Sequence, residues 1–486
     1  MLNSPYFKKH LPFICITLLL MVVSLLDRLI PEGMFFDGTL YAAIARNLAI
    51  GKGSFWAPYV SHGTLFFEHP PLMFAIESFF FRIFGDHLYT EKIYSFITWV
   101  ITALLIVKLW TKNSTDENYR YSFWLPLLLW CCIPTTLWSY PNNMLECTMG
   151  IFDLAAVLIL YRLAETNKNK VLYLLVAAFL ILFAALSKGP VGLFPLAVPA
   201  IHWLAFKKNT LGNVFLSSIT LFALVATAYM LLWQFDAPRY NISMYLDNQL
   251  FSALSGSREK VDSSLGHFAL LSFMLAEFAA PLVLCILIVL ASILLKLKSD
   301  NSLSKRTRIA IFFLLIGLSA SLPVMVSIKQ RSFYLVPSLP YYVISFALFT
   351  YPYLTALIKR YTLPVRIYLF FKIALIVAAL AGVPYLLKNV GTAGREQELV
   401  HDIKIISSII PEADTVGICP DMIKDFPFLA YAERYHQIFV IQHKNKTANR
   451  LILNNTMCST QFTDSILQAG FKKQETGTWR YIVYQK

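Results

Sequence analysis

Eleven long apolar segments run through this 486-residue sequence, and they constrain its fold more than any other feature. Each is roughly 17–28 residues long, the length that a helix needs to cross a bilayer. Apolar residues make up 57% of the chain and charged residues only 14%, so one soluble core could not bury this much apolar surface. We therefore predict membrane-spanning helices at 11–28, 93–110, 121–139, 144–161, 171–187, 190–206, 214–235, 268–295, 310–328, 333–351 and 366–387.

The first apolar run, 11–26, follows three basic residues, as the apolar part of a signal peptide does. No small-residue cleavage site follows it, because the chain continues with Asp27, Arg28 and Pro31. We therefore interpret this run as a retained first helix.

The basic residues determine the expected orientation. The net charge of +14 is typical of nucleic-acid-binding proteins, but here Lys and Arg stand at the ends of the apolar runs, so we exclude nucleic acid as a partner. With the N-terminus in the cytoplasm, every inside loop is basic, as the positive-inside rule requires. An odd number of spans places the tail outside, which in a bacterium is the periplasm. We thus expect a multi-pass protein of the bacterial inner membrane.

The polar parts of the chain define the expected domains. The first outside segment, 29–92, carries two amphipathic stretches, 39–50 and 68–85, that are typical of interfacial helices. A second outside loop covers 236–267. The expected fold is an α-helical polytopic membrane domain over 1–387 followed by a small periplasmic α/β domain over 388–486. In that domain we predict strands at 415–419, 437–442, 450–454 and 480–485, and helices near 396–410 and 464–470.

The seven cysteines contain no C-x-x-C pair, which argues against a cysteine–zinc site. Five lie in or beside apolar runs, where cysteine is usually a small buried residue. Cys419 and Cys458 lie in the tail, where they either form a disulfide or remain two free thiols.

Four basic residues break the positive-inside rule, because they lie on the expected outer side: Lys188, Arg258, Lys329 and Arg331. If they face one cavity, they form an anion site, since Lys and Arg both suit phosphate. Alternatively, each is a loop charge near lipid headgroups. We favour a functional role for Lys188, which precedes Gly-Pro between two spans, and for Arg258.

Three acidic residues lie on the same side. Asp37 and Glu68 are flanked by apolar residues, and a carboxylate held at the membrane surface is a candidate general base or electrostatic anchor. Partial burial would raise the pKa of such a carboxyl group. Asp37 also suits a helix N-cap, and both roles are compatible. Glu146 is a further candidate, or else a hydrogen-bonded residue of the interface.

Two histidines accompany these acids. His69 adjoins Glu68, and His267 precedes a span at the outer surface. A lone histidine is more often structural than a ligand. However, a Glu and His set with an open position can bind a divalent cation, so Glu68 and His267 are candidate metal ligands.

Together, these motifs resemble the GT-C glycosyltransferases that use polyprenyl-phosphate sugars, over about residues 10–350. The branch they resemble most is the bacterial 4-amino-4-deoxy-L-arabinose lipid A transferase, and the protein O-mannosyltransferases are more distant. The resemblance rests on five motifs in their order along the chain, namely DGTLYAAIARNL, EHPPL, FRIFG, SKGPVG and KQRSFYLVPSLP.

The resemblance implies roles for individual residues. Asp37 matches the family's catalytic Asp, and Glu68 matches an acid of a metal site whose second ligand is His267. Lys188, Arg258 and Tyr334 would line the cavity, the first two near the donor phosphate. His69 stands where the family usually has a phosphate-contacting Lys, Gly38 where it often has Glu, and Lys92 where it usually has Arg. A histidine in that position would make donor binding depend on pH.

The expected function is therefore transfer of a sugar from a polyprenyl phosphate, with inversion, to a lipid A-type or other glycolipid, a glycan or a protein. Donor phosphate binding is assigned to His69, Lys188, Arg258, Lys329 and Tyr334, with Arg331 nearby. A divalent metal is an optional cofactor, no nucleotide is expected, and we expect a monomer in contact with membrane lipid. One alternative is a protein O-mannosyltransferase-like enzyme. Another is a flippase for a lipid-linked sugar, although no internal repeat favours it. A non-catalytic scaffold is the third alternative.

Overall fold

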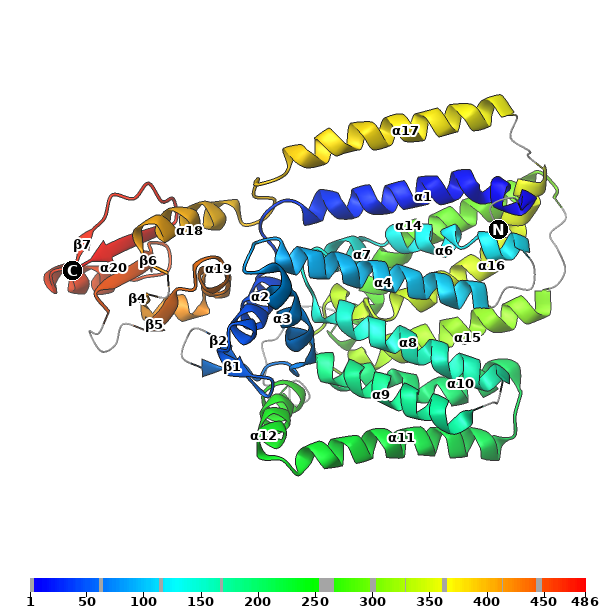
Figure 1. The fold of residues 1–486 in the computed structure, drawn as a ribbon, viewed down its shortest axis with the longest axis horizontal. Helices are drawn as coiled ribbons and strands as arrows, with labels where there is room; N and C mark the ends of the chain where they lie inside the picture. The colour runs from blue at the N-terminus through cyan, green and yellow to red at the C-terminus, as the bar shows by residue number, and fades with distance from the viewer. Residues whose placement is uncertain are drawn as a thin grey trace.

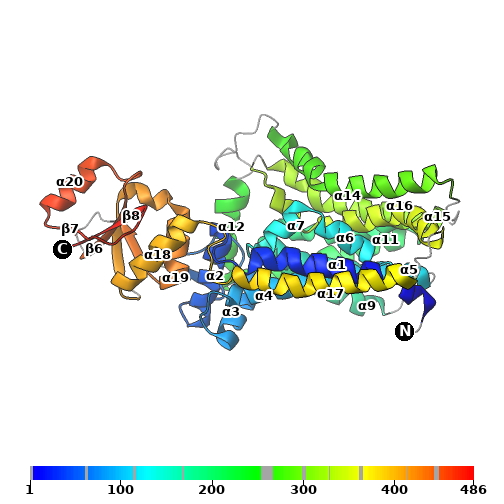
Figure 2. The same cartoon turned by 90° about the horizontal axis from the view of Figure 1, so that it is seen from above.

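The computed structural model describes residues 4–60, 64–112, 117–166, 169–252, 266–297, 303–327, 329–360, 365–412, 414–442 and 448–486. Its long helices form a bundle, and a smaller domain of strands and helices projects from one end of it (Figure 1). The short helices α2, α3 and α12 lie between these two parts in both side views (Figures 1 and 2). The expected fold class is thus confirmed.

Among the described residues, eight helices are long and apolar enough to cross a membrane. They are α1 (Pro5–Leu29), α4 (Thr90–Lys112), α8 (Leu145–Thr166), α9 (Lys170–Lys188), α11 (Leu211–Trp233), α14 (Ala269–Leu294), α15 (Leu303–Ser321) and α16 (Leu339–Arg360). Each coincides with one of the eleven predicted spans.

The other three predicted spans are helical but differ in form. The segment 121–139 is not one helix: α6 (Trp124–Cys131) ends before α7 (Pro134–Ser139) begins. The break lies at Ile133, which is extended because it precedes a proline. The segment 190–206 starts as the 3-10 helix η1 (Pro190–Ala197) and continues as α10 (Val198–Phe206). The last segment is α17 (Val365–Lys388), which runs beside α1 at the edge of the bundle (Figure 1).

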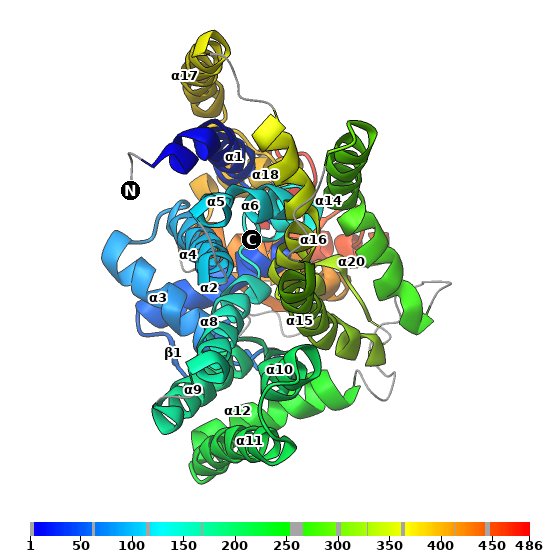
Figure 3. The same ribbon diagram turned by 90° about the vertical axis from the view of Figure 1, so that its right-hand side faces the viewer.

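The bundle packs around one continuous apolar core that includes large buried rings such as Trp110, Trp130 and Phe312. Neighbours along the chain pack together, as α8 does with α9 and α15 with α16. Seen along the bundle, α17 and α11 lie at opposite edges (Figure 3). The outward faces carry exposed apolar side chains, including Phe222 on α11 and Leu275 on α14, as expected for surfaces that contact lipid.

The segment 29–92, which we predict to lie outside, includes two helices and a small sheet. The predicted amphipathic stretches become α2 (Phe36–Ala49) and α3 (Leu72–Phe84), which pack against each other. Between them, β1 (Gly53–Ser54), β2 (Ala57–Val60) and β3 (Thr64–Leu65) form an antiparallel sheet that we did not predict. The segment 236–267, also predicted to lie outside, includes α12 (Asp236–Tyr245) and the π-helical turn Leu246–Phe251.

The tail forms a five-stranded sheet in the order β5-β4-β6-β8-β7. Its strands are β4 (Thr415–Ile418), β5 (Phe439–Gln442), β6 (Arg450–Asn454), β7 (Lys472–Lys473) and β8 (Tyr481–Gln485), and β4 pairs in parallel with both β5 and β6. The helices α18 (Gln397–Ile409), α19 (Phe426–His436) and α20 (Thr460–Gln468) pack with the sheet. Four strands and two helices agree with the prediction, whereas α19 and β7 were missed.

Cys419 and Cys458 form a disulfide across this domain, with their Cα atoms 5.9 Å apart. This decides between the two alternatives that the sequence left open. The other five cysteines are free and lie within the bundle.

Candidate active site

Five candidate residues from distant parts of the sequence gather around the first turn of α2. The ionisation of Asp37 is influenced by the charges of four others, which therefore lie close to it: Glu68, Glu146, Lys188 and Lys329. Glu146 stands at the start of α8 and Lys188 at the end of α9, while Glu68 precedes α3 and Lys329 precedes α16. The topology thus brings together side chains that the sequence analysis selected one by one.

Asp37 occupies the first turn of α2, but it is not the N-cap. Phe35 is the N-cap, with φ −59° and ψ 137°, and its N–H donates to Oδ1 of Asn142 at 2.5 Å. The interpretation of Asp37 as a cap is therefore wrong. Burial raises the pKa of Asp37 to about 6, with Glu146 and Glu68 adding to the rise and Lys188 and Lys329 opposing it. A carboxyl group with this pKa can accept a proton near neutral pH.

Lys188 forms an ion pair with Glu146, whose side chain is fully buried at the start of α8. The Lys188 ammonium group also lies over the ring of Tyr334, 5.0 Å from its centroid, and 5.8 Å from that of Phe333. Burial of a charge requires such compensation. The end of α9 is fixed as well, because the hydroxyl of Tyr245 donates to the carbonyl of Lys188 at 3.1 Å.

Tyr41 and His69 form one wall of the cluster. Tyr41 is buried one turn after Asp37, and its ring meets the ring of His69 edge to face, with centroids 5.7 Å apart. Burial raises the pKa of Tyr41, and the negative charges of Asp37 and nearby groups raise it further, so its hydroxyl stays protonated. Glu68 is exposed beside this wall. Tyr41 was not selected from the sequence, although it is the tyrosine of the motif that contains Asp37.

The segment before α16 carries the remaining candidates. Tyr334 lies in the 3-10 turn Ser332–Leu335 and faces Lys188, whereas Arg331 is exposed. Gln330 is buried and ties this segment to α14, since its side chain accepts from the N–H of Leu270 at 2.6 Å and donates to the carbonyl of His267 at 2.9 Å. Arg258 lies outside the described residues.

A divalent metal ion held by Glu68 and His267 stays a prediction. Within the part of the chain that the structure describes, no group of three or more His, Cys, Asp or Glu side chains comes together. His267 is exposed, and its Nδ1 lies 2.8 Å from the carbonyl oxygen of Met325. Glu68 and His267 therefore do not form a ligand set of that size, and we derive no step through a metal.

The loop between α7 and α8 packs against the start of α2. This contact was not predicted from the sequence. A Cβ atom on Gly38 would lie 1.8 Å from the carbonyl oxygen of Asn142, so only glycine allows α2 to approach this loop. Asn143, at φ 52°, donates to Oε1 of Glu77 at 2.8 Å and to the carbonyl of Gly38 at 3.5 Å. The departure from the family pattern at position 38 thus has a packing reason. The motif PNNM contains the only sequence signal, since asparagine tolerates positive φ.

A cavity of about 300 Å³ lies next to the cluster, at the end of α1. Its lining includes Arg28, Trp138, Asn142 and Arg395. Trp138 stacks on Phe333 with ring centroids 5.4 Å apart, and Phe333 in turn lies near Lys188, so an aromatic wall separates the cavity from the cluster. Two guanidinium groups and one carboxylate, that of Asp27, line this cavity, so its lining keeps a net positive charge that suits an anionic group.

Comparison with known proteins places this fold and site in context. Residues 68–233 match the model of the dolichyl-phosphate-mannose-protein mannosyltransferase family. The structure is similar to that of ArnT from Cupriavidus metallidurans bound to undecaprenyl phosphate, with a TM-score of 0.61 and 12% identity over 97% of both chains. For ArnT in the apo state the TM-score is 0.59 at 14% identity, over 97% of this chain and 96% of that one. The apo oligosaccharyltransferase of Archaeoglobus fulgidus has a TM-score of 0.50 at 12% identity, over 89% of this chain and 65% of that one.

A search of the curated proteins finds no significant match. The identities to the solved structures are low, so these structures establish the fold alone. The chain has the fold of ArnT along nearly its whole length. The resemblance that the motifs indicated is thereby confirmed.

Proposed function

We propose that this protein is a membrane glycosyltransferase that takes a sugar from a polyprenyl-phosphate donor at the outer face of a bacterial inner membrane. The observation that carries the proposal is the Asp37 carboxyl group, which is half-buried, has its pKa raised to about 6 by desolvation and lies near Lys188, Lys329 and Tyr41. Support also comes from the ArnT-like fold, since one such structure contains undecaprenyl phosphate. The disulfide in the tail fits an oxidising compartment such as the periplasm.

In the proposed reaction, Asp37 accepts the proton of the acceptor hydroxyl or phosphate as its oxygen attacks the anomeric carbon. The new glycosidic bond forms while the bond between that carbon and the donor phosphate oxygen breaks. The leaving group is polyprenyl phosphate, which keeps the electron pair. A single displacement of this kind inverts the anomeric centre. Removal of water by the apolar surroundings strengthens the electrostatic interactions in this step.

Positive charge near the leaving phosphate stabilises the transition state. We assign this role to Lys329 and Lys188, with Arg258, His69 and Tyr334 as further contacts of the donor phosphate. Lys188 is already paired with Glu146. Its charge therefore lies beside Asp37, and Lys329 adds a second positive charge near the same carboxyl group.

For the acceptor we favour a glycolipid with an anionic group. The cavity that contains Arg28 and Arg395 adjoins the site and lies at the end of the spanning helix α1, where a lipid headgroup would be. A protein acceptor is the second candidate, because residues 68–233 match a protein mannosyltransferase family.

A transfer assay in proteoliposomes distinguishes these acceptors. The purified protein would receive radiolabelled polyprenyl-phosphate sugar and membrane extract, and the label would be followed into lipid and protein fractions. Label in a glycolipid, with the opposite anomeric configuration to the donor, is the expected result. Label in protein would select the second candidate. Movement of the intact donor between leaflets without transfer would instead indicate a flippase.

A further inference from the structure

Helix α19 of the tail domain runs against α2, the helix that carries Asp37. The tail domain otherwise projects from the bundle (Figure 1). The contacts between α19 and this part of the chain include buried hydrogen bonds at the residues directly before α2 and in its last turn. A domain that merely hung from the bundle would need no such contacts.

The first set of contacts fixes the chain directly before α2. The hydroxyl of Tyr431 accepts from the N–H of Met34 at 2.8 Å and donates to the carbonyl of the same residue at 2.6 Å. The hydroxyl of Tyr435 accepts from the N–H of Gly33 at 3.2 Å. Tyr431 is fully buried, and the two rings stack with centroids 5.2 Å apart. Asp37 lies only three residues after Met34. The two tyrosine hydroxyl groups therefore fix the position of the backbone that leads into Asp37.

The second set of contacts fixes the last turn of α2. Arg46 donates to the carbonyl of Glu433 at 2.9 Å, and Asn47 donates to Oε1 of Glu433 at 2.7 Å. Arg46 also pairs with Asp86 at 3.1 Å. Arg46, Asn47 and Glu433 are all almost fully buried. The helix is therefore held at its start and at its end by the same tail helix.

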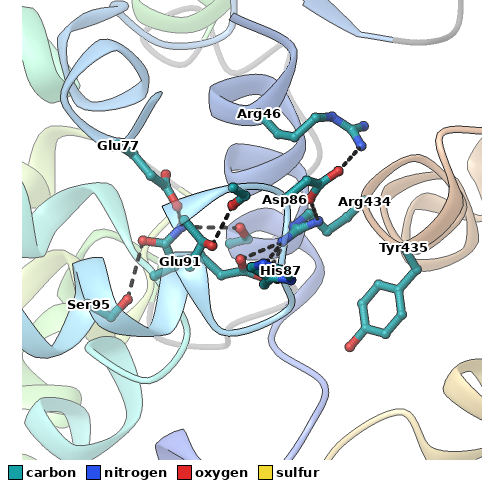
Figure 4. Close-up of polar contacts among 12 residues, drawn as sticks. Arg46, Glu77, Asp86, His87, Glu91, Ser95, Arg434 and Tyr435 are labelled. Atoms are coloured by element: carbon teal, nitrogen blue, oxygen red, sulfur yellow. Dashed lines mark hydrogen bonds and ion pairs between the residues drawn. The ribbon is translucent and has the colours of Figure 1, made fainter. Parts of the chain in front are cut away.

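A buried arginine of the tail links this arrangement to the bundle (Figure 4). Arg434 donates to Glu91 at the start of α4, with distances of 3.2 and 2.7 Å, and pairs with Asp86 at 2.7 Å. Asp86 thus bridges Arg434 and Arg46, as the close-up shows. Each guanidinium group is about 2% exposed or less, so their acceptors are needed to keep both charges buried.

We propose that the tail domain is part of the catalytic unit, and that Tyr431 and Tyr435 are positioning residues that set the location of Asp37 through residues 33 and 34. This inference rests on the proposed function for its catalytic readout, but its structural content does not. The tail helix acts as a rigid support, against which α2 is aligned relative to Lys188 and Lys329. Rigid support of a reacting group matters because small displacements have large effects on rate.

The test replaces the hydroxyl groups and keeps the rings, in Tyr431→Phe and in the double variant Tyr431→Phe/Tyr435→Phe. The matched control is Tyr481→Phe. Its hydroxyl is equally buried in the tail, but it donates to Asp425 at 2.9 Å within the domain rather than to the segment before α2. Hydrogen exchange of residues 33–49 would be measured in the full-length protein without any substrate, together with kcat and the KM for the donor.

We expect faster exchange at the start of α2 and a fall in kcat of about 10-fold or more in Tyr431→Phe, with little change in the KM for the donor. The double variant should be slower still, and Tyr481→Phe should resemble the wild type in both readouts. Equal losses in Tyr481→Phe and Tyr431→Phe would overturn the inference, because they would reflect domain stability alone. Wild-type exchange and kcat in the double variant would overturn it as well. If the wild-type protein itself transfers no sugar, the exchange data still decide this inference, and only the proposed function fails.

Discussion

The ammonium group of Lys188 forms an ion pair with the carboxylate of Glu146, at the point where the end of α9 meets the start of α8. Both side chains are largely buried, with 11% and 1% of their surface exposed. Their charges act in opposite directions on Asp37, since Lys188 lowers its pKa and Glu146 raises it. The pair therefore adjusts the pKa of the proposed general base in two opposite directions.

The first prediction concerns the pH dependence of transfer. Asp37 must be ionised to accept a proton, so kcat should fall as the pH drops through about 6. Removing the negative charge in Glu146→Gln should move this acidic limb to lower pH, and removing the positive charge in Lys188→Met should move it to higher pH. A limb that shifts the same way in both variants would contradict the assignment.

The second prediction concerns the stability of the Lys188–Glu146 pair. Lys188→Met leaves a buried carboxylate without its partner, which should reduce the free energy of unfolding by about 3–5 kcal/mol. In the double variant Lys188→Met/Glu146→Gln most of this loss should be recovered, while transfer stays impaired. Thermal unfolding in detergent would measure the stability, and additive losses in the double variant would contradict a direct pair.

The third prediction follows from the cost of burying Asp37. Its pKa rises from 3.8 to about 6 in the folded protein, which corresponds to about 3 kcal/mol of destabilisation when the group is ionised. Asp37→Asn should therefore be more stable than the wild type above pH 6. Because the folded pKa is raised, the difference should shrink as the pH falls from 6 and vanish below 3.8. An advantage of the same size at pH 3.5 and pH 8 would refute this origin.

The fourth prediction tests the close approach at Gly38. A methyl group there would meet the carbonyl of Asn142, so Gly38→Ala should displace the first turn of α2 and reduce kcat by about 100-fold. Gly212 is the control, since it also lies in a helix and an added Cβ meets nothing within 4 Å. Gly212→Ala should leave transfer unchanged. Equal activity in the two variants would show that Gly38 has no positional role.

The fifth prediction concerns the disulfide. It closes a loop with a separation of 39 residues, so replacing both Cys419 and Cys458 by alanine should cost the tail about 4 kcal/mol. Thiol labelling of intact cells before and after reduction would also report the side of the membrane. Cysteines 419 and 458 should react with an impermeant reagent only after reduction. Labelling without reduction would indicate free thiols.

Much of this architecture was predictable from the sequence, because a helix that crosses a bilayer must be long and apolar. Length and apolarity identify spanning helices, and nine of the eleven segments became single long helices, namely the eight candidate spans and α17. The exceptions contain prolines, which interrupt the regular hydrogen bonding of a helix: Pro134 in the third segment, and Pro190 and Pro195 in the sixth. Asp37, Glu68 and Lys188 were found because charge is rare at such positions.

The contacts that position the site were not predictable in this way. Helix α19 was missed because its sequence, FPFLAYAERYH, mixes apolar and charged residues without a clear periodicity, although Asp425 caps it by accepting from the N–H of Phe428. Its buried polar bonds to α2 join residues about 390–400 positions apart, for example Met34 and Tyr431. No local pattern encodes such a pairing. Likewise, the requirement for glycine at position 38 depends on a carbonyl group about 100 residues away.

The most direct test of the proposed function is sugar transfer by the wild type and Asp37→Asn in proteoliposomes that contain a radiolabelled polyprenyl-phosphate sugar and native membrane acceptors. Asparagine keeps the shape of the side chain but cannot take up the proton. We predict that the wild type transfers label to an acceptor and that Asp37→Asn loses activity by about 100-fold or more while remaining folded. Transfer at the wild-type rate by folded Asp37→Asn would contradict the central claim.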